Sequence, residues 1–397
     1  MAKRRNDEPS SYVRLTTNTT MRDFFIPSKV RNLPESEITI IEQRASEGDP
    51  VASYKLAQIL LAWRDTDDYL DQVDPLLATA AEGGVIDAYV AKAAILCEEG
   101  MLPEMFLDAQ ELLEFALENK SEYATKVYIE NIIFGKWGYE VDLDKAIELL
   151  SELLQTSDNP MWHHMMGLAT EIKDGLYFST VWYEGAVNGG YDDAWYNLAV
   201  ARAFDDDYEL EDEEWYKETL QEGIDRNDTT SLVHYACHIA KDWEEMSDED
   251  AAEKAALANS IISAYDTGYK AGLPVACYLL GKVYENGLYG QDVDYGMAME
   301  IYKRGVLFNS VICVEAMYDM LQNDFFAALD EDNELSDQCA LKGARGGSER
   351  LVVATVDAYY EGRLKEYADE IEKYFIPIYN DMADPEMDDD GRYDAWA

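Results

Sequence analysis

Two pairs of histidines are the residues best suited to metal chemistry. His234 and His238 are four residues apart, so a helix would place them on one face, beside Cys237, at a spacing that can hold zinc. The segment reads H-Y-A-C-H, without the glutamate of an H-E-x-x-H site, and the spacing indicates no third ligand. His163 and His164 are adjacent and would point about 100° apart on a helix. We therefore expect both pairs to pack in the interior and predict no metal site.

Clusters of carboxylates raise the question of calcium. An EF-hand loop requires Gly at its sixth position and Glu at its twelfth. Counted from Asp205, those positions hold Leu210 and Tyr216, so the pattern fails. We expect the clusters to be solvated connections between helices. They comprise Asp205–Asp207 with Glu209 and Glu211–Glu214, then Glu244–Asp250, and then Asp330–Glu334.

Motifs of enzymes are missing from the sequence. It contains no G-x-S-x-G, no G-x-x-x-x-G-K-[ST] and no G-x-G-x-x-G segment. We predict no catalytic residue, no cofactor and no enzymatic activity. Because 81 acidic residues guarantee many accidental carboxylate pairs, an enzyme without a recognisable motif stays open as an alternative.

The elements that would position any site follow an internal repeat. Segments such as 47–60, 83–96, 189–201 and 271–284 share a Gly or Asn turn, a small residue and then an apolar helix. The small residue is the anchor of each unit, and successive anchors are 32 to 45 residues apart, mostly 36 to 38. That spacing fits two helices and two turns. The anchors are Ala52, Ala88, Ala124, Trp162, Ala194, Ser231, Ala276, Cys313 and Leu351.

A second helix of each unit is visible at 105–120, 142–157 and 294–310. In the middle segment, Leu143, Ala146, Ile147, Leu150 and Leu154 are spaced by three, four and seven residues, which gives an amphipathic stripe. Neither helix could bury its apolar face alone, so stacked neighbours must share a core. The sequence predicts an all-α fold, an α/α superhelical solenoid.

The unit at 276–312 resembles the Sel1-like repeat, a relative of the tetratricopeptide repeat. The residues that carry the resemblance are Ala276, Tyr278, Leu279, Gly281, Tyr284, Gly287, Asp292, Ala298 and Tyr302. The unit that begins at Ala194 matches fairly, whereas Trp162, Ser231, Cys313 and Leu351 replace the small anchor elsewhere. The resemblance extends over about residues 37–375 and implies a scaffold that binds other proteins, with no reaction.

The helical wheel indicates which face of the first helices would bind a partner. Positions two, six and nine after the anchor lie off the core stripe, on the face that usually lines the groove of such arrays. Tyrosine recurs at the second of these positions and offers large, rigid contact area. We predict a protein or peptide in the groove, bound by Tyr54, Tyr196, Tyr278, Lys282 and Glu285. The alternative is that these tyrosines, like His164, pack against the adjacent repeat.

The two ends differ from the repeat region. Residues 1–33 hold seven basic and three acidic residues, a net charge of +4. We predict a basic extended arm at 1–36, the helical array at 37–380 and an acidic disordered tail at 381–397. The start of the chain has no apolar segment typical of a secretory signal, and no run of 18 apolar residues predicts a membrane span. Five scattered cysteines indicate reduced thiols and a cytoplasmic protein.

The charge decides between classes of partner. A formal net charge of −49 repels phosphate backbones, so we expect no nucleic acid on the acidic body and no membrane. The first interpretation is an adaptor whose protein partner is basic. A second is a DNA mimic that inhibits a nucleic-acid-binding protein, although the clustering of carboxylates in turns argues against it. A third is adaptation of the whole surface to a salt-rich cytoplasm.

Overall fold

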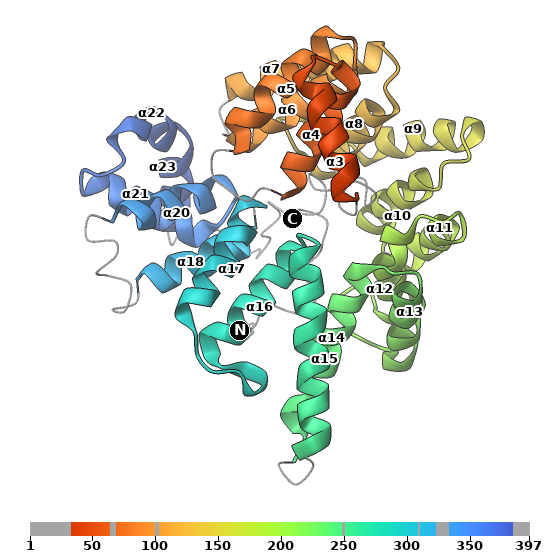
Figure 1. Ribbon diagram of the computed structural model, residues 1–397, viewed down its shortest axis with the longest axis vertical. Helices are drawn as coiled ribbons and strands as arrows, with labels where there is room; N and C mark the ends of the chain where they lie inside the picture. Colours follow the sequence, from red (N-terminus) through yellow and green to blue (C-terminus); the bar gives the residue numbers. More distant parts are fainter. Residues whose placement is uncertain are drawn as a thin grey trace. The chain divides into compact units, whose positions relative to one another are not determined.

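Helices account for nearly all the regular structure of the computed structural model, which describes residues 33–63, 69–99, 103–247, 251–308, 310–322 and 333–383 (Figure 1). These residues form no strand; one isolated bridge joins Phe204 and Leu210. The all-α prediction is confirmed for this part of the chain. Most of the predicted arm and tail lies outside it, although the first described helix, α3 (Glu35–Ser46), begins within the predicted arm.

The chain divides into two compact units, each described here by itself. Among the described residues, the first unit holds 122–247, 251–276 and 288–291. The second holds 33–121 and 292–383, each with the gaps given above, together with 277–287. The division passes through helix α16.

The first helix of each pair begins within two residues of a predicted anchor. All nine anchors are buried, so their assignment from the spacing is confirmed. The nine helices are α4 (Pro50–Trp63), α6 (Asp87–Glu99), α8 (Glu122–Phe134), α10 (Met161–Asp174), α12 (Trp195–Ala203), α14 (Thr229–Glu245), α16 (Pro274–Asn286), α18 (Val311–Leu321) and α21 (Glu349–Tyr360).

The second helices fill the intervals and include the three that the sequence predicts at 105–120, 142–157 and 294–310. They are α5 (Tyr69–Glu82), α7 (Pro103–Glu118), α9 (Leu143–Thr156), α11 (Leu176–Asn188), α13 (Glu213–Asp225), α15 (Ala251–Lys270), α17 (Tyr295–Leu307) and α20 (Glu334–Arg345). After α21 the chain continues through a 3-10 turn (Lys365–Tyr367), α22 (Ala368–Glu370), a π-helical turn (Ile371–Phe375) and α23 (Ile376–Ala383). Two further 3-10 turns are η1 (Asp192–Ala194) and η3 (Leu288–Gly290).

Glycines of the second helices explain how a pair meets the next one. Each of four glycines lies eight residues before an anchor and packs directly on it, so that a methyl group there would be 2.0 to 2.5 Å from the anchor side chain. Because glycine has no side chain, the anchor side chain of the next helix can pack directly against the backbone of the second helix. The contacts are Gly223–Ser231, Gly268–Ala276, Gly305–Cys313 and Gly343–Leu351.

Acidic side chains begin several helices. Asp142, Asp212 and Asp294 each cap a second helix, accepting a hydrogen bond of 2.9 to 3.0 Å from a backbone N–H three residues on. In the α12–α13 connection, Asp205 accepts bonds from the N–H groups of residues 207 and 209. The first acidic cluster is therefore a helix connection up to Asp212, as predicted, whereas Glu213 and Glu214 form the first turn of α13. The second acidic cluster, Glu244–Asp250, begins in α14 and ends outside the described residues. Most of the third cluster, Asp330–Glu334, also lies outside them.

Candidate functional site

The tyrosines two residues after the anchors bridge consecutive first helices. Tyr196 of α12 is only 4% exposed, and its ring stacks on His234 of α14 with 3.8 Å between centroids. At the same position of α10, His164 Nε2 is 3.3 Å from Asn197 Oδ1 of α12. Tyr196 therefore cannot present its ring to a partner, and the structure corrects that part of the predicted groove. The packing alternative holds for Tyr196 and His164.

Tyr54 and Tyr278 occupy the same register but are only partly buried. Burial is the main cause that raises the pKa of Tyr54, and the carboxylate of Asp87 in the next first helix adds to it. Burial also raises the pKa of Tyr278, with further contributions from Glu285, Glu315 and Asp319. Tyr278 therefore lies in a negative field while part of its ring stays open to solvent.

Lys282 and Glu285 belong to a network inside the α16–α17 pair. Lys282 Nζ is 2.8 Å from Glu285 Oε2 and lies 5.7 Å from the centroid of the Tyr278 ring. The hydroxyl of Tyr302 donates a 2.6 Å hydrogen bond to the same glutamate oxygen. Burial and this carboxylate raise the pKa of Tyr302 far above its ordinary value. Glu285 Oε2 therefore accepts hydrogen bonds from both Lys282 and Tyr302, and this oxygen stabilises the helix pair.

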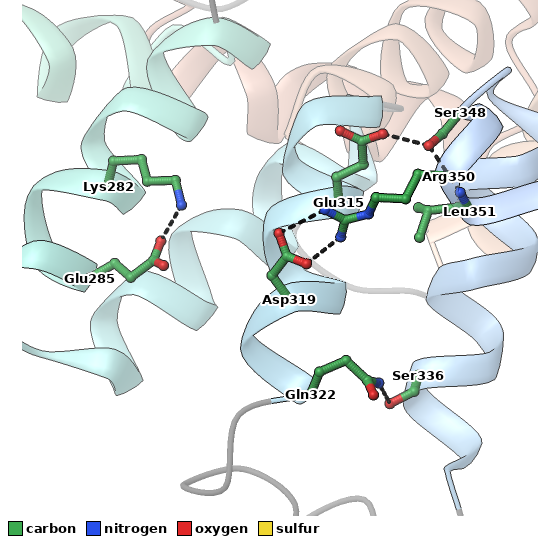
Figure 2. Close-up of polar contacts among 9 residues, drawn as sticks. All are labelled: Lys282, Glu285, Glu315, Asp319, Gln322, Ser336, Ser348, Arg350 and Leu351. Atoms are coloured by element: carbon green, nitrogen blue, oxygen red, sulfur yellow. Dashed lines mark hydrogen bonds and ion pairs between the residues drawn. The ribbon is translucent and has the colours of Figure 1, made fainter. Parts of the chain in front are cut away.

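The next first helix places two more carboxylates on this side of the second unit (Figure 2). Glu315 accepts a hydrogen bond from Ser348, which also caps α21. Asp319 pairs with Arg350 of α21, and 3.2 Å separates Arg350 Nη1 from Asp319 Oδ2. Asp319 remains 51% exposed despite this pair.

Three consecutive first helices of the second unit carry polar residues at equivalent positions. Asp319 and Asp357 stand six residues after their anchors, as Lys282 does, and Tyr360 stands nine after its own, as Glu285 does. Asp357 is exposed and Tyr360 is 60% exposed. We call this surface the acidic helix face; it comprises Tyr278, Lys282, Glu285, Glu315, Asp319, Asp357 and Tyr360.

The chemistry of the acidic helix face suits a cationic ligand. Exposed carboxylates pair with ammonium and guanidinium groups, and tyrosine rings accept the same cations on their faces. The face holds four carboxylates and one lysine, and Arg350 of α21 pairs with Asp319, so its formal charge stays negative.

The histidine pairs are engaged in packing, as expected from their sequence. His234 stacks on Tyr196, whereas His238 Nε2 is 3.1 Å from Glu213 Oε1, so the two side chains serve different neighbours. His163 lies under α11, against Trp182 and Gly185. The described residues contain no group of three or more His, Cys, Asp or Glu side chains able to hold a metal ion. No helix among them is long and apolar enough to cross a membrane.

Sequence reasoning missed one pair of contacts that recurs. Glu171 in α10 accepts a hydrogen bond from Tyr183 in α11, as Glu285 does from Tyr302. In both pairs a glycine precedes the glutamate by four residues, Gly167 in the first case. The signal was present as G-x-x-x-E in both first helices, but the tyrosines stand 12 and 17 residues after their glutamates. That unequal distance hides the relationship.

Comparison with known proteins gives matches in structure alone. No family model matches the chain, and no curated protein matches it in sequence. It is similar to a Sel1 repeat protein from Oxalobacter formigenes, at 15% identity and a TM-score of 0.43, over 87% of this chain and 95% of the other. It is also similar to a protective antigen of uropathogenic Escherichia coli that displays an SLR fold, at 14% identity and a TM-score of 0.38, over 84% and 76% of the two chains. The fold described above rests on the helix pairs of this chain.

Proposed function

We propose that this chain is a Sel1-like repeat scaffold of the cytoplasm, without enzymatic activity, that binds a basic segment of a partner protein on its acidic helix face. The main support for this proposal is that successive first helices have carboxylates and tyrosines at equivalent positions. The G-x-x-x-E helices and the 36 to 38 residue spacing support the repeat assignment. The scattered cysteines, of which Cys277, Cys313 and Cys339 are buried, suit a reducing compartment.

A basic peptide that crosses α18 and α21 would meet Asp319 and then Asp357. Its Lys or Arg stems would lie along the exposed part of the Tyr278 and Tyr360 rings. Exposed ion pairs contribute only about 0–1 kcal/mol each, so the charges select basic partners and speed association more than they hold the complex. Affinity would come from the aromatic contacts, and it would fall as salt rises.

The test compares two charge reversals of equal size. Asp319→Lys with Asp357→Lys alters the acidic helix face, whereas Glu218→Lys with Glu222→Lys alters exposed positions of α13 in the other unit. Both variants and the unaltered chain serve as bait in a native lysate, at low and at high salt, with bound proteins identified by mass spectrometry. We expect a basic protein that is retained at low salt by the unaltered chain and by the α13 variant, and lost from the face variant.

Equal capture by all three baits would contradict the proposal. Asp319→Lys also removes the partner of Arg350, so thermal unfolding of the variant must be checked. Asp357→Lys with Tyr360→Ala is a second face variant that leaves the Arg350 pair intact. It should lose the same protein.

A further inference from the structure

The outward side of α11 carries a stripe of large apolar side chains that are mostly exposed. Tyr177 is 80% exposed, Phe178 57% and Val181 62%. The opposite side of the same helix buries Leu176 and Tyr183 in the core of the first unit. The helix is therefore apolar on two sides, although only one is used by the fold.

The second helix α9 of the same unit has a polar outward side. In α9, Asp144, Lys145, Glu148 and Glu152 face solvent at least in part, as expected for a surface helix. Over its 13 residues α11 has one charged residue, Glu184, in a chain of which 28% of residues are charged. Large apolar side chains contiguous on a surface mark an interaction site more often than a solvated face.

The surroundings of the stripe are acidic. Asp206 Oδ1 accepts a 2.8 Å hydrogen bond from the N–H of Leu176, which fixes the α12–α13 connection at the start of α11. The same connection holds four further acidic residues, Asp205, Asp207, Glu209 and Glu211. We call the five acidic residues of this connection the acidic rim, because Asp206 holds the connection at the N-terminal end of α11.

A third aromatic side chain, Trp215 of α13, extends the stripe beyond an arginine that contacts both helices. Arg202 Nη2 is 3.0 Å from Glu184 Oε1 of α11, and its guanidinium carbon lies 5.6 Å from the centroid of the Trp215 ring of α13. Trp215 is 47% exposed. On the helical wheel, Tyr177 lies between Val181 and Glu184, so the apolar surface runs from Phe178 toward α13.

We propose that this surface, defined by Tyr177, Phe178, Val181 and Trp215 and named the α11 stripe, docks an amphipathic helix of a partner protein. The apolar side of that helix would carry large residues at spacings of three and four, to meet the stripe. Lys or Arg at one end of it would meet the acidic rim. This contact is separate from the acidic helix face, which belongs to the other unit and selects charge without an apolar stripe.

The negative charge around the α11 stripe argues against two other possible ligands, a second copy of this chain and a lipid surface. A second copy of this chain would bring its own acidic rim and a further formal charge of −49. An anionic lipid surface would be repelled by the same carboxylates. A basic amphipathic helix satisfies both the apolar side chains and the rim.

The test uses a fluorescein-labelled 18-residue peptide of Leu, Ala and Lys designed as an amphipathic helix, and a scrambled peptide of equal composition. Fluorescence anisotropy gives Kd for the full chain at about 0.15 M salt, where long-range attraction is largely screened. The stripe variant is Phe178→Gln with Val181→Gln. The matched control is Val293→Gln with Met297→Gln, which removes two exposed apolar side chains of the other unit without changing the charge.

We expect the stripe variant to bind the amphipathic peptide at least tenfold more weakly, since buried apolar anchors carry most binding energy. The control should bind within twofold of the unaltered chain, and the scrambled peptide should bind weakly to all. The same tenfold loss should appear when Phe178→Gln with Val181→Gln is made in a chain that already carries Asp319→Lys with Asp357→Lys, which separates this inference from the proposed function.

Three results would overturn the inference. The first is equal affinity of the stripe variant and the unaltered chain. The second is a dimer in sedimentation velocity that Phe178→Gln with Val181→Gln dissolves, because a second copy would then be the occupant. The third is a more than tenfold gain in peptide affinity on deletion of residues 1–32, because this chain's own segment would then cover the stripe. Circular dichroism of each variant confirms that the helices are intact.

Discussion

Tyr302 donates a hydrogen bond to Glu285 across the α16–α17 pair, with 2.6 Å between its hydroxyl oxygen and Glu285 Oε2. The tyrosine ring reaches the glutamate by lying flat on Gly281, four residues earlier on α16, where no side chain intervenes. Glycine is the residue that makes the approach possible. In both the α10–α11 and the α16–α17 pair, a glycine, a glutamate and a tyrosine together hold the two helices in contact.

Gly281→Ala should destabilise the α16–α17 pair. The added methyl group would lie 2.2 Å from Cε1 of Tyr302, so the ring must move away from Glu285. We expect a loss of about 1–3 kcal/mol in the free energy of unfolding, as is usual for overpacking. This outweighs the gain of up to ~1 kcal/mol in helix propensity. Urea denaturation followed by circular dichroism measures it.

Gly296→Ala is the matched control, because Gly296 lies in the other helix of the same pair, α17, and a methyl group there would meet only a carboxylate oxygen of Asp294, at 3.4 Å. Propensity should then dominate, leaving stability unchanged or raised by up to ~1 kcal/mol. Equal effects of the two substitutions would show that the ring does not depend on the space above Gly281.

Tyr183 and Tyr208 should prove interdependent. Tyr183 donates a 2.6 Å hydrogen bond to Glu171 Oε2, and Tyr208 donates one of the same length to Oε1. Glu171 is only 9% exposed. Tyr183→Phe or Tyr208→Phe alone should cost about 1–2 kcal/mol of unfolding free energy. The double variant should cost more than the sum, because a buried carboxylate then loses both hydroxyl donors. A double-mutant cycle measured by denaturation gives the coupling, and strict additivity would argue against it.

The repeat and the positions of its helices were predictable because they depend on local periodicity. The anchors and the stripe of the 142–157 segment follow from spacings of three, four and about 37 residues, and burial at Ala88, Ala194 and Ala276 confirms them. Even the degenerate anchor Leu351 was placed correctly. Its size is accommodated by Gly343 on the preceding helix, a contact between residues only eight apart.

The binding face was harder to predict because a helical wheel gives direction but not coverage. The wheel places Tyr196 off the core stripe of α12. It cannot show that α14 brings His234 within 3.8 Å of that ring. Likewise, the wheel places Glu285 on the face of the predicted groove, yet its acceptor oxygen is engaged by Tyr302 from a helix farther along the chain. Contacts between neighbouring helices decide which residues of a face stay free.

The stability of the α13–α14 contact should depend on pH through Glu213. Hydrogen bonds from Lys217 (2.7 Å) and then His238 (3.1 Å) lower the pKa of Glu213 to about 2. Since an unfolded glutamate titrates near 4.5, this carboxylate stabilises the folded state above that pH. The contribution should decline as the pH falls from 4.5 and disappear below 2.

Glu213→Gln isolates this contribution. Urea denaturation of both proteins should show a constant difference in unfolding free energy between pH 5 and 6, which shrinks as the medium is acidified. Because Glu213 is exposed, 1 M salt should reduce the difference at pH 6 by screening. A difference that grows on acidification would contradict the assigned hydrogen bonds.

Gly343 and Leu351 should behave as one packing unit. Leu351→Ala leaves a cavity at a fully buried anchor and should cost about 2–5 kcal/mol of unfolding free energy. Gly343→Ala places a methyl group 2.0 Å from Cδ1 of Leu351 and should cost about 1–3 kcal/mol by overpacking. In the double variant the new methyl group occupies part of the space that leucine vacates. We therefore expect the double variant to be more stable than the sum of the two losses predicts, by about 1 kcal/mol or more. Equilibrium denaturation of all four proteins tests this, and losses that simply add would show that the second helix does not rest on the anchor of the next pair.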